Sequence, residues 1–320
     1  MKSRSESLIR LKKFQVDEPL YKLRADIVRR HYDRGEPKLW LDVGTGHGHF
    51  PLHARDVFPE TRFEALDMGE AVLTAERRGW IAKAHYGLLV ETSDALAGQY
   101  DVVSMHHCLE HTSDPRDQVI HLKKCLRPGG YLSIEVPDPE CYAGELLKGW
   151  WGPWFQPQHQ NMVPIGNLCA AMRAEGFTIV ATEREEAHEQ FEATMAVFLR
   201  LNALAPPPNL PWRENKSTDT AKRVAVFTAA APALAAAVVI DKLVNGYVRK
   251  QPNGPNAYRV LARLNDDGGT GAAGNGVARE RAGAIADAGP EGHPGVPGLR
   301  QALKAFADHE PDVGAGSDGD

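Results

Sequence analysis

An acid and three alternating glycines follow an apolar run in the segment Leu39–Phe50, where residues 42–48 read Asp-Val-Gly-Thr-Gly-His-Gly. An apolar run that stops at such residues predicts a strand turning tightly into a helix. Glycine adopts positive φ and lets a ligand approach the bare backbone, and the first free N–H groups of a helix attract a carboxylate or phosphate. We therefore expect a nucleotide-like cofactor on this turn.

The glycine spacing indicates which cofactor binds. A dinucleotide fingerprint, G-x-G-x-x-G, needs glycine at position 49, where this chain has His49, and its third glycine comes one residue early at Gly48. Asp42 brings a carboxylate close to the ligand, which disfavours a phosphate and suits an amino group. This combination favours S-adenosylmethionine over a nicotinamide dinucleotide.

A second acid, Asp67, ends the predicted strand Arg62–Asp67, 23 residues after Gly44. At that distance a carboxylate can accept both ribose hydroxyls of an adenosyl group. The alternative is that Asp67 caps a helix starting near Gly69.

Four motifs in order resemble those of the class I S-adenosylmethionine-dependent methyltransferases. They are the glycine turn at 42–48, the second motif at Glu64–Glu70, the fourth-strand motif at Tyr100–Pro115 and the turn Leu126–Tyr131. With a looser match through the Trp-rich segment, the resemblance covers about residues 38–204. It implies an α/β fold with a doubly wound, seven-stranded, mostly parallel sheet (a Rossmann-like methyltransferase fold) and S-adenosylmethionine as cofactor.

The cofactor site is expected at the glycine turn and at the ends of the second and fourth strands. Its expected residues are Asp42, Gly44, Thr45, Gly46, Gly48, Asp67, Met68 and His106. Many relatives carry an acid after the third strand that holds the adenine amino group. Tyr86–Leu89 has none, and Asp94 is the candidate substitute.

Methyl transfer from a sulfonium needs mainly a nucleophile held in line, with a base where that nucleophile is a hydroxyl. Histidine suits the task because its ordinary pKa is near neutrality. The candidate catalytic residues are His107, beside His106 at the end of the fourth strand, and His159 in the insertion after the fifth. A hydrogen-bonded lid histidine is the alternative for His159.

His107, Glu110 and His111 have the i, i+3, i+4 spacing that could converge on a metal from one helical turn. Some quinone-pathway relatives have an acid-x-x-Glu-His element that binds a divalent cation. Here His107 replaces the acid, and magnesium prefers oxygen ligands. The sequence therefore predicts that Glu110 and His111 position the loop, and it predicts no metal.

Four aromatic residues fall within residues 150–155: Trp150, Trp151, Trp154 and Phe155. They predict either a wall over an apolar or aromatic acceptor or a packed corner that anchors the insertion. Both interpretations stay open.

The composition is that of one full α/β core with additions, since the chain has 320 residues and 42% hydrophobic content. The net charge is −5 without a basic stripe, so no nucleic acid is expected as partner. Four cysteines without C-x-x-C pairing fit a reducing cytoplasm, and the first thirty residues lack a signal-peptide core. We expect a cytoplasmic protein, with membrane association open.

Five parts are expected: a helical cap at 1–37, the methyltransferase domain at 38–204, a Pro-rich linker at 205–211, a helical extension at 212–265 and a disordered tail at 266–320. Residues 177–182 and 194–204 are predicted to form an antiparallel hairpin at the sheet edge. The charge-free segment 224–240 predicts a helical hairpin, and residues 221–248 could dock on the catalytic domain, dimerise or rest on a membrane surface.

The sequence thus predicts a methyltransferase acting on an O, N or C nucleophile of a small apolar or aromatic molecule. A nicotinamide-dependent oxidoreductase is the first alternative, disfavoured by His49 and by the lack of a Ser-Tyr-Lys proton relay. A non-catalytic adenosyl-binding or membrane-tethering module is the second.

Overall fold

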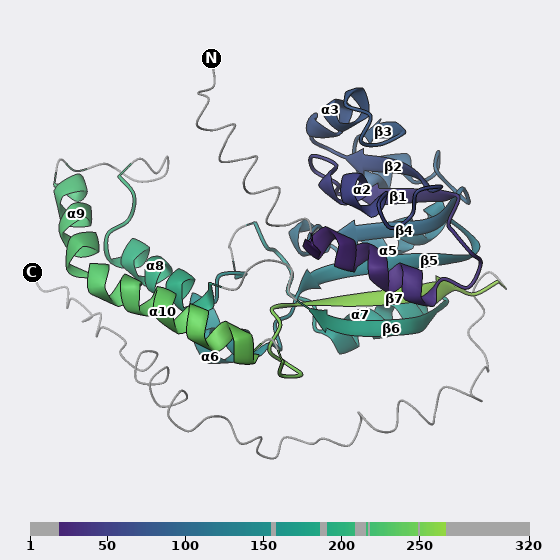
Figure 1. Cartoon of the computed structure of the whole chain (residues 1–320). Helices are drawn as coiled ribbons and strands as arrows, with labels where there is room; N and C mark the ends of the chain where they lie inside the picture. The colour runs from purple at the N-terminus through teal and green to yellow at the C-terminus, as the bar shows by residue number, and fades with distance from the viewer. Residues whose placement is uncertain are drawn as a thin grey trace, which may run out of the picture.

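The computed structural model describes residues 19–154, 158–185, 191–208, 216, 218–248 and 250–266. A seven-stranded sheet in the order β3-β2-β1-β4-β5-β7-β6 forms its centre (Figure 1). The strands are β1 (Leu39–Val43), β2 (Arg62–Asp67), β3 (Lys83–Tyr86), β4 (Tyr100–His106), β5 (Leu126–Pro137), β6 (Phe177–Glu185) and β7 (Ala257–Leu264). Only β7 runs antiparallel to its neighbours, β5 and β6. The predicted seven-stranded, mostly parallel α/β fold is confirmed.

Helices cover both faces of this sheet. The helices of the described residues, on these faces or beside the sheet, are one over residues 19–31 and α2 (His49–Ala54), α3 (Ala71–Arg77), α4 (Leu89–Thr92), η1 (Leu109–His111), α5 (Pro115–Cys125), α6 (Tyr142–Leu147), η2 (Lys148–Trp150), α7 (Ile165–Ala174), α8 (Glu192–Leu204), α9 (Asp219–Ala229) and α10 (Ala231–Val248).

Successive side chains of β1 pack into different hydrophobic cores on opposite faces of the sheet, because side chains alternate across a strand. Trp40 packs with the helix over residues 19–31 and with α2, whereas Leu41 and Val43 pack with α5 and α7. The sheet is therefore buried on both sides, as a doubly wound fold requires.

The strand register places the candidate cofactor residues at one edge. Val43 lies opposite Leu66 on β2 and Met105 on β4. The residues that follow, Gly44, Asp67 and His106, therefore meet at the carboxyl ends of parallel strands, where ligands bind in open α/β sheets.

The predicted hairpin at the end of the sheet is wrong in its second strand. Residues 194–204 belong to α8, and the antiparallel partner of β6 is β7, at 257–264. The Asp241 carboxylate on α10 accepts hydrogen bonds from the N–H groups of Ala193 and Thr194, both at 2.9 Å. This long-range cap stabilises the start of α8, and the short apolar run alone did not separate helix from strand.

The segment 224–240 is helical with a break at Ala230, between α9 and α10. In Figure 1 α8, α9 and α10 lie together to one side of the sheet. The helix α10 is long and apolar enough to cross a membrane, with mean hydropathy 1.3, and exposes Val239, Leu243 and Tyr247. Docking, dimerisation and membrane contact of this part stay predictions.

Several expectations fall outside the described residues. These are the first half of the helical cap, residues 209–211 at the end of the linker, the position of Phe155, and the tail beyond Asp266.

Candidate functional site

All three glycines of the turn have positive φ: 71° at Gly44, 57° at Gly46 and 77° at Gly48. A Cβ on Gly44 would lie 2.4 Å from Cys108 Sγ, and one on Gly48 would lie 2.7 Å from Ala75 Cβ. A Cβ on Gly46 would meet no described atom within 4 Å. Two glycines thus allow close packing, while the middle one borders open space where a ligand can lie.

The Asp67 carboxylate holds the turn from the end of β2. Its Oδ2 accepts the Gly46 N–H and its Oδ1 accepts the Gly69 N–H, both at 2.7 Å. The helix α3 begins only at Ala71, and no side chain caps it. Asp67 therefore orders the glycine turn, and a carboxylate retains lone pairs for further donors.

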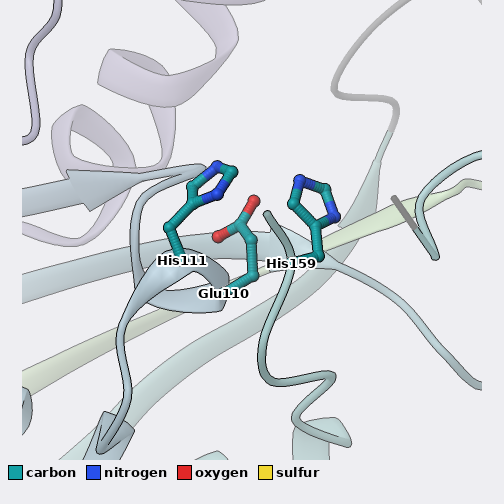
Figure 2. A group of neighbouring side chains, drawn as sticks. All are labelled: Glu110, His111 and His159. Carbon is teal, nitrogen blue, oxygen red and sulfur yellow. The ribbon is translucent and has the colours of Figure 1, made fainter. Parts of the chain in front are cut away.

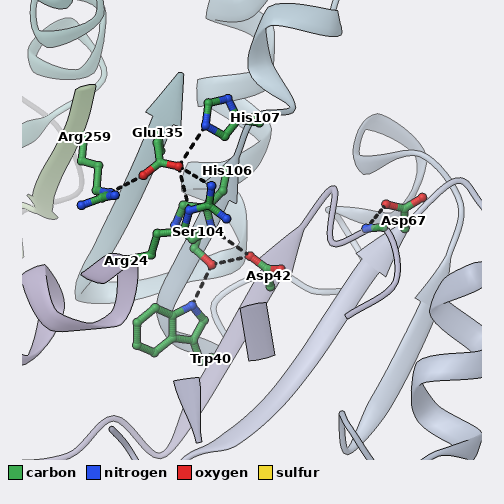
Figure 3. A network of polar contacts seen from close by, with 10 residues as sticks. Arg24, Trp40, Asp42, Asp67, Ser104, His106, His107, Glu135 and Arg259 are labelled. Carbon is green, nitrogen blue, oxygen red and sulfur yellow. Dashed lines mark hydrogen bonds and ion pairs between the residues drawn. The ribbon is translucent and has the colours of Figure 1, made fainter. Parts of the chain in front are cut away.

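A chain of buried polar side chains orients Asp42 under the turn (Figure 3). Trp40 Nε1 donates to Ser104 Oγ at 2.8 Å, and Ser104 Oγ donates to Asp42 Oδ1 at 2.7 Å. His106 Nδ1 lies 3.4 Å from the same oxygen without hydrogen-bond geometry, and neither ring nitrogen of His106 has a hydrogen-bond partner among the described residues. Asp42 raises the pKa of His106, but burial lowers it by more. The lowered pKa keeps the ring neutral.

A cavity of about 180 Å³ opens at this edge of the sheet. It is lined by Tyr21, Arg24, Asp42, Gly44, Thr45, His49, Phe50, His106 and His107. Both ring nitrogens of His106 and Thr45 Oγ1 are buried and have no hydrogen-bond partner within the described ranges. Such atoms are typical of a ligand-binding site and rare in a packed core.

His107 lies between two carboxylates at the cavity wall. Its Nδ1 is 3.1 Å from Glu110 Oε1, and its Nε2 is 3.0 Å from Glu135 Oε1, the contact that Figure 3 shows. Burial lowers the pKa of His107, but the two carboxylates outweigh burial and raise it. A histidine held as a cation is a poor proton acceptor, so this geometry argues against His107 as general base.

Glu135 is fully buried on β5 and pairs with two further cations at the cavity wall. Arg24 Nε donates to Oε1 at 2.7 Å, and Arg259 Nε on β7 donates to Oε2. Burial raises the pKa of Glu135, but Arg24, Arg259 and His107 outweigh it and hold the pKa well below its ordinary value. This network ties the helix over residues 19–31 to the sheet beside the cavity.

A family profile described as "Methyltransferase domain" matches residues 16–182, about half of the chain. The chain belongs to the class I S-adenosylmethionine-dependent methyltransferase family. The cofactor indicated for this methyltransferase is S-adenosylmethionine, as the glycine spacing predicted.

Two curated relatives illustrate the match. The malonyl-[acyl-carrier protein] O-methyltransferase of Paenibacillus sp. (strain JDR-2) is 29% identical over 178 residues, covering 52% of this chain and 63% of that protein. The ubiquinone biosynthesis O-methyltransferase of Erwinia tasmaniensis is 34% identical over 122 residues, covering 35% of this chain and 49% of that protein. The chain thus spans less than two thirds of the length of either relative.

Among solved structures, a SAM-dependent methyltransferase from Archaeoglobus fulgidus aligns with a TM-score of 0.48 and 18% identity. That alignment covers 80% of this chain and 99% of the other.

The cavity of this methyltransferase brings together five of the predicted site residues: Asp42, Gly44, Thr45, His106 and His107. Gly46, in the turn itself, and Asp67, which accepts its N–H, do not line the cavity. Gly48 serves packing against α3, and Met68 is 68% exposed. Asp94, the candidate adenine contact, pairs with Lys124 at 2.9 Å and does not line the cavity.

His159 lies outside the cavity lining, next to η1 (Figure 2). Its Nδ1 is 2.5 Å from the Pro153 carbonyl oxygen, and its ring meets His111 edge-on at 4.6 Å between centroids. Burial lowers the pKa of His159 and outweighs the Pro153 carbonyl, which raises it, so the ring is neutral near pH 7. Trp151 is fully buried with Cys141 and Met162, which fits the packed corner, while Trp154 remains 39% exposed.

Sequence reasoning missed Tyr21, Arg24, Glu135 and Arg259 as parts of this site. A signal existed for two of them, because Glu135 and Arg259 are charges inside strands whose neighbours are apolar. Buried charges are rare unless paired, but the sequence does not indicate which strands pair.

Proposed function

We propose that this chain transfers the methyl group of S-adenosylmethionine to a nucleophile of a small molecule, with oxygen the favoured attacking atom. The observation that carries the proposal is the cavity beside the glycine turn. There the buried ring of His106, which has no hydrogen-bond partner in the described part of the chain, and the oriented carboxylate of Asp42 face space bordered by the bare backbone of Gly44.

The donors and acceptors at this edge fit the cofactor. The Asp42 carboxylate suits an ammonium group, Arg24 suits a carboxylate, and Asp67 suits the ribose hydroxyls. The cofactor supplies a methyl group on a positively charged sulfur, which is activated without help from the protein. The chain's own residues therefore need only hold it, exclude water and position the nucleophile.

We assign the binding of the methyl acceptor to the loop that carries His159. The ring of His159 is neutral, whereas His107 is held as a cation by Glu110 and Glu135. A neutral imidazole offers a lone pair to a proton or a cation. This supports His159 over His107 as the histidine that assists an oxygen nucleophile.

An oxygen acceptor on a small molecule has two supports. The relatives named above are called O-methyltransferases, one of an acyl-carrier protein substrate and one of ubiquinone biosynthesis. The net charge of −5 disfavours a polyanionic nucleic acid.

The test is incubation of the purified chain with S-adenosylmethionine and a metabolite extract, followed by mass spectrometry. We expect S-adenosylhomocysteine and a product heavier by one methylene. Cofactor binding without S-adenosylhomocysteine from any acceptor would favour a non-catalytic adenosyl-binding module. Retention of a nicotinamide dinucleotide in place of S-adenosylmethionine would favour the oxidoreductase.

A further inference from the structure

One side of α10, which we call its inner side, packs against α8. Ala237 is buried there with Val197 and Leu201, and Leu234 lies against the same cluster. Asp241, one turn after Ala237, is 3% exposed, and its carboxylate accepts the two N–H groups at the start of α8. The inner side therefore carries residues 234, 237 and 241.

The opposite, outer side of α10 carries a stripe of apolar side chains four residues apart. The stripe consists of Ala235, Val239, Leu243 and Tyr247, all of them exposed, and this spacing keeps them on one face of the helix. Val239 is 53% exposed, Leu243 75% and Tyr247 51%. In Figure 1 α10 lies to one side of the sheet. A helix that is apolar all round normally buries all its sides, and an exposed apolar patch marks an interaction surface.

The charges exposed on α9 and α10 are all positive. Lys242 is exposed on α10, and Lys222 is exposed on α9 near Val224, which is 61% exposed. The two acids of described residues 218–248, Asp219 and Asp241, are only 8% and 3% exposed. The exposed surface of these two helices is therefore apolar and positively charged, although the whole chain has a net charge of −5.

We propose that the outer side of α10 binds the surface of a bilayer that contains anionic phospholipids. The apolar face of such a helix enters the boundary between headgroups and acyl chains, and nearby lysines are attracted to anionic headgroups. The long stem of Lys242 lets its ammonium group reach the headgroups while Leu243 lies deeper. Tyr247 suits the same boundary, because it has an apolar ring and a polar hydroxyl.

Charge argues against a second copy of this chain as the occupant of the stripe. Two copies that meet through the same face form a two-fold contact. Such a contact brings the Lys242 side chains of both copies to one interface, and like charges placed together at an interface are costly. An anionic lipid surface complements these lysines.

The length and the charges of α10 argue for binding in the plane of the bilayer surface and against crossing it. The helix has 18 residues, whereas a span needs about 20. It also contains Asp241, whose carboxylate would have to leave the start of α8 and enter the hydrocarbon. A charge at that depth is costly.

Sedimentation with lipid vesicles tests this surface without a methyl acceptor or cofactor. The full chain is incubated with vesicles of phosphatidylcholine alone and with vesicles of equal parts phosphatidylcholine and phosphatidylglycerol. We expect binding to the anionic vesicles and much weaker binding to the neutral ones. Added salt should weaken the binding to anionic vesicles, because it screens the lysines.

Two substitutions on α10 separate the apolar and the charged contribution. Leu243→Gln should lower the affinity for anionic vesicles roughly tenfold, because one leucine is no longer buried in lipid. Lys242→Gln should lower it about fivefold, the effect of one lysine near an anionic surface. Leu88→Gln and Lys83→Gln are the matched controls, since both residues are exposed at β3, an edge strand of the sheet, and should leave the binding unchanged. Circular dichroism checks that all four variants are folded.

Equal affinity of the wild type and Leu243→Gln for anionic vesicles overturns the proposal, as does equal binding of the wild type to both kinds of vesicle. A dimer that Leu243→Gln dissociates in analytical ultracentrifugation, without vesicle binding, would assign the stripe to a second copy. Binding that resists alkaline carbonate would mean that α10 crosses the bilayer and would overturn the surface geometry. Calorimetry with S-adenosylmethionine in the absence of lipid tests the proposed function separately, so each proposal can fail alone.

Discussion

Asp67 Oδ2 accepts the backbone N–H of Gly46 at 2.7 Å, so the end of β2 and the middle of the glycine turn form one unit. The same carboxylate accepts the Gly69 N–H through Oδ1. A residue expected to bind ribose thus also fixes the backbone on which we expect the cofactor to lie, so its removal should affect both cofactor binding and the order of the turn.

We expect Asp67→Ala to weaken S-adenosylmethionine binding by about 1–3 kcal/mol, because charged hydrogen bonds are lost. Isothermal calorimetry measures the effect. Asp114→Ala is the control, since the Asp114 carboxylate also accepts two backbone N–H groups, of Arg116 and Asp117, at the start of α5. The control should lose stability and keep its cofactor affinity. Unchanged affinity in Asp67→Ala would remove the ribose role.

Gly46→Ala should abolish or strongly weaken cofactor binding, and Gly46→Val more so. Gly46 has φ of 57° and open space at its Cβ position, and Gly98 has φ of 68° and equally open surroundings. Each alanine should cost about 1–2 kcal/mol of stability from the left-handed backbone. Only the Gly46 variant should lose affinity for S-adenosylmethionine. Equal affinities in the two variants would place the ligand elsewhere.

Glu135→Gln should destabilise the fold by about 3 kcal/mol, because it removes the buried negative charge with which the guanidinium groups of Arg24 and Arg259 pair. Urea denaturation measures the change. Asp94→Asn breaks the exposed pair with Lys124 and should change stability little. Comparable effects of the two substitutions would show that the Glu135 network is not a structural link.

We expect His49 to contribute to the change of the free energy of unfolding with pH. Burial first, then His47, His53 and Arg78, lower the pKa of His49 from 6.5 to about 4. As pH falls below 6.5 the unfolded chain takes up a proton that the folded protein does not, so the stability present above 6.5 is lost progressively down to about pH 4. His49→Gln should therefore lose less stability between pH 7 and pH 5 in urea titrations. The same loss in both proteins would contradict the assignment.

The sequence by itself determined the parts of the fold built from local signals. The apolar run that ends at Val43 and the strand that ends at Asp67 were predicted from such signals, and they match β1 and β2. The predicted turn Leu126–Tyr131 lies instead inside β5, which begins at Leu126. These signals are local because backbone preference and side-chain alternation act over a few residues.

The last strand and the cavity wall were decided by tertiary structure. Residues 257–264 become β7 because β5 and β6 offer hydrogen-bonding edges on both sides, and residues 194–204 become α8 with a cap from Asp241. Likewise His107, a predicted base, is held as a cation once Glu135 lies across from it. Contacts between residues more than a hundred positions apart, such as Arg24 and Glu135, depend on chain topology, and a local pattern does not encode them.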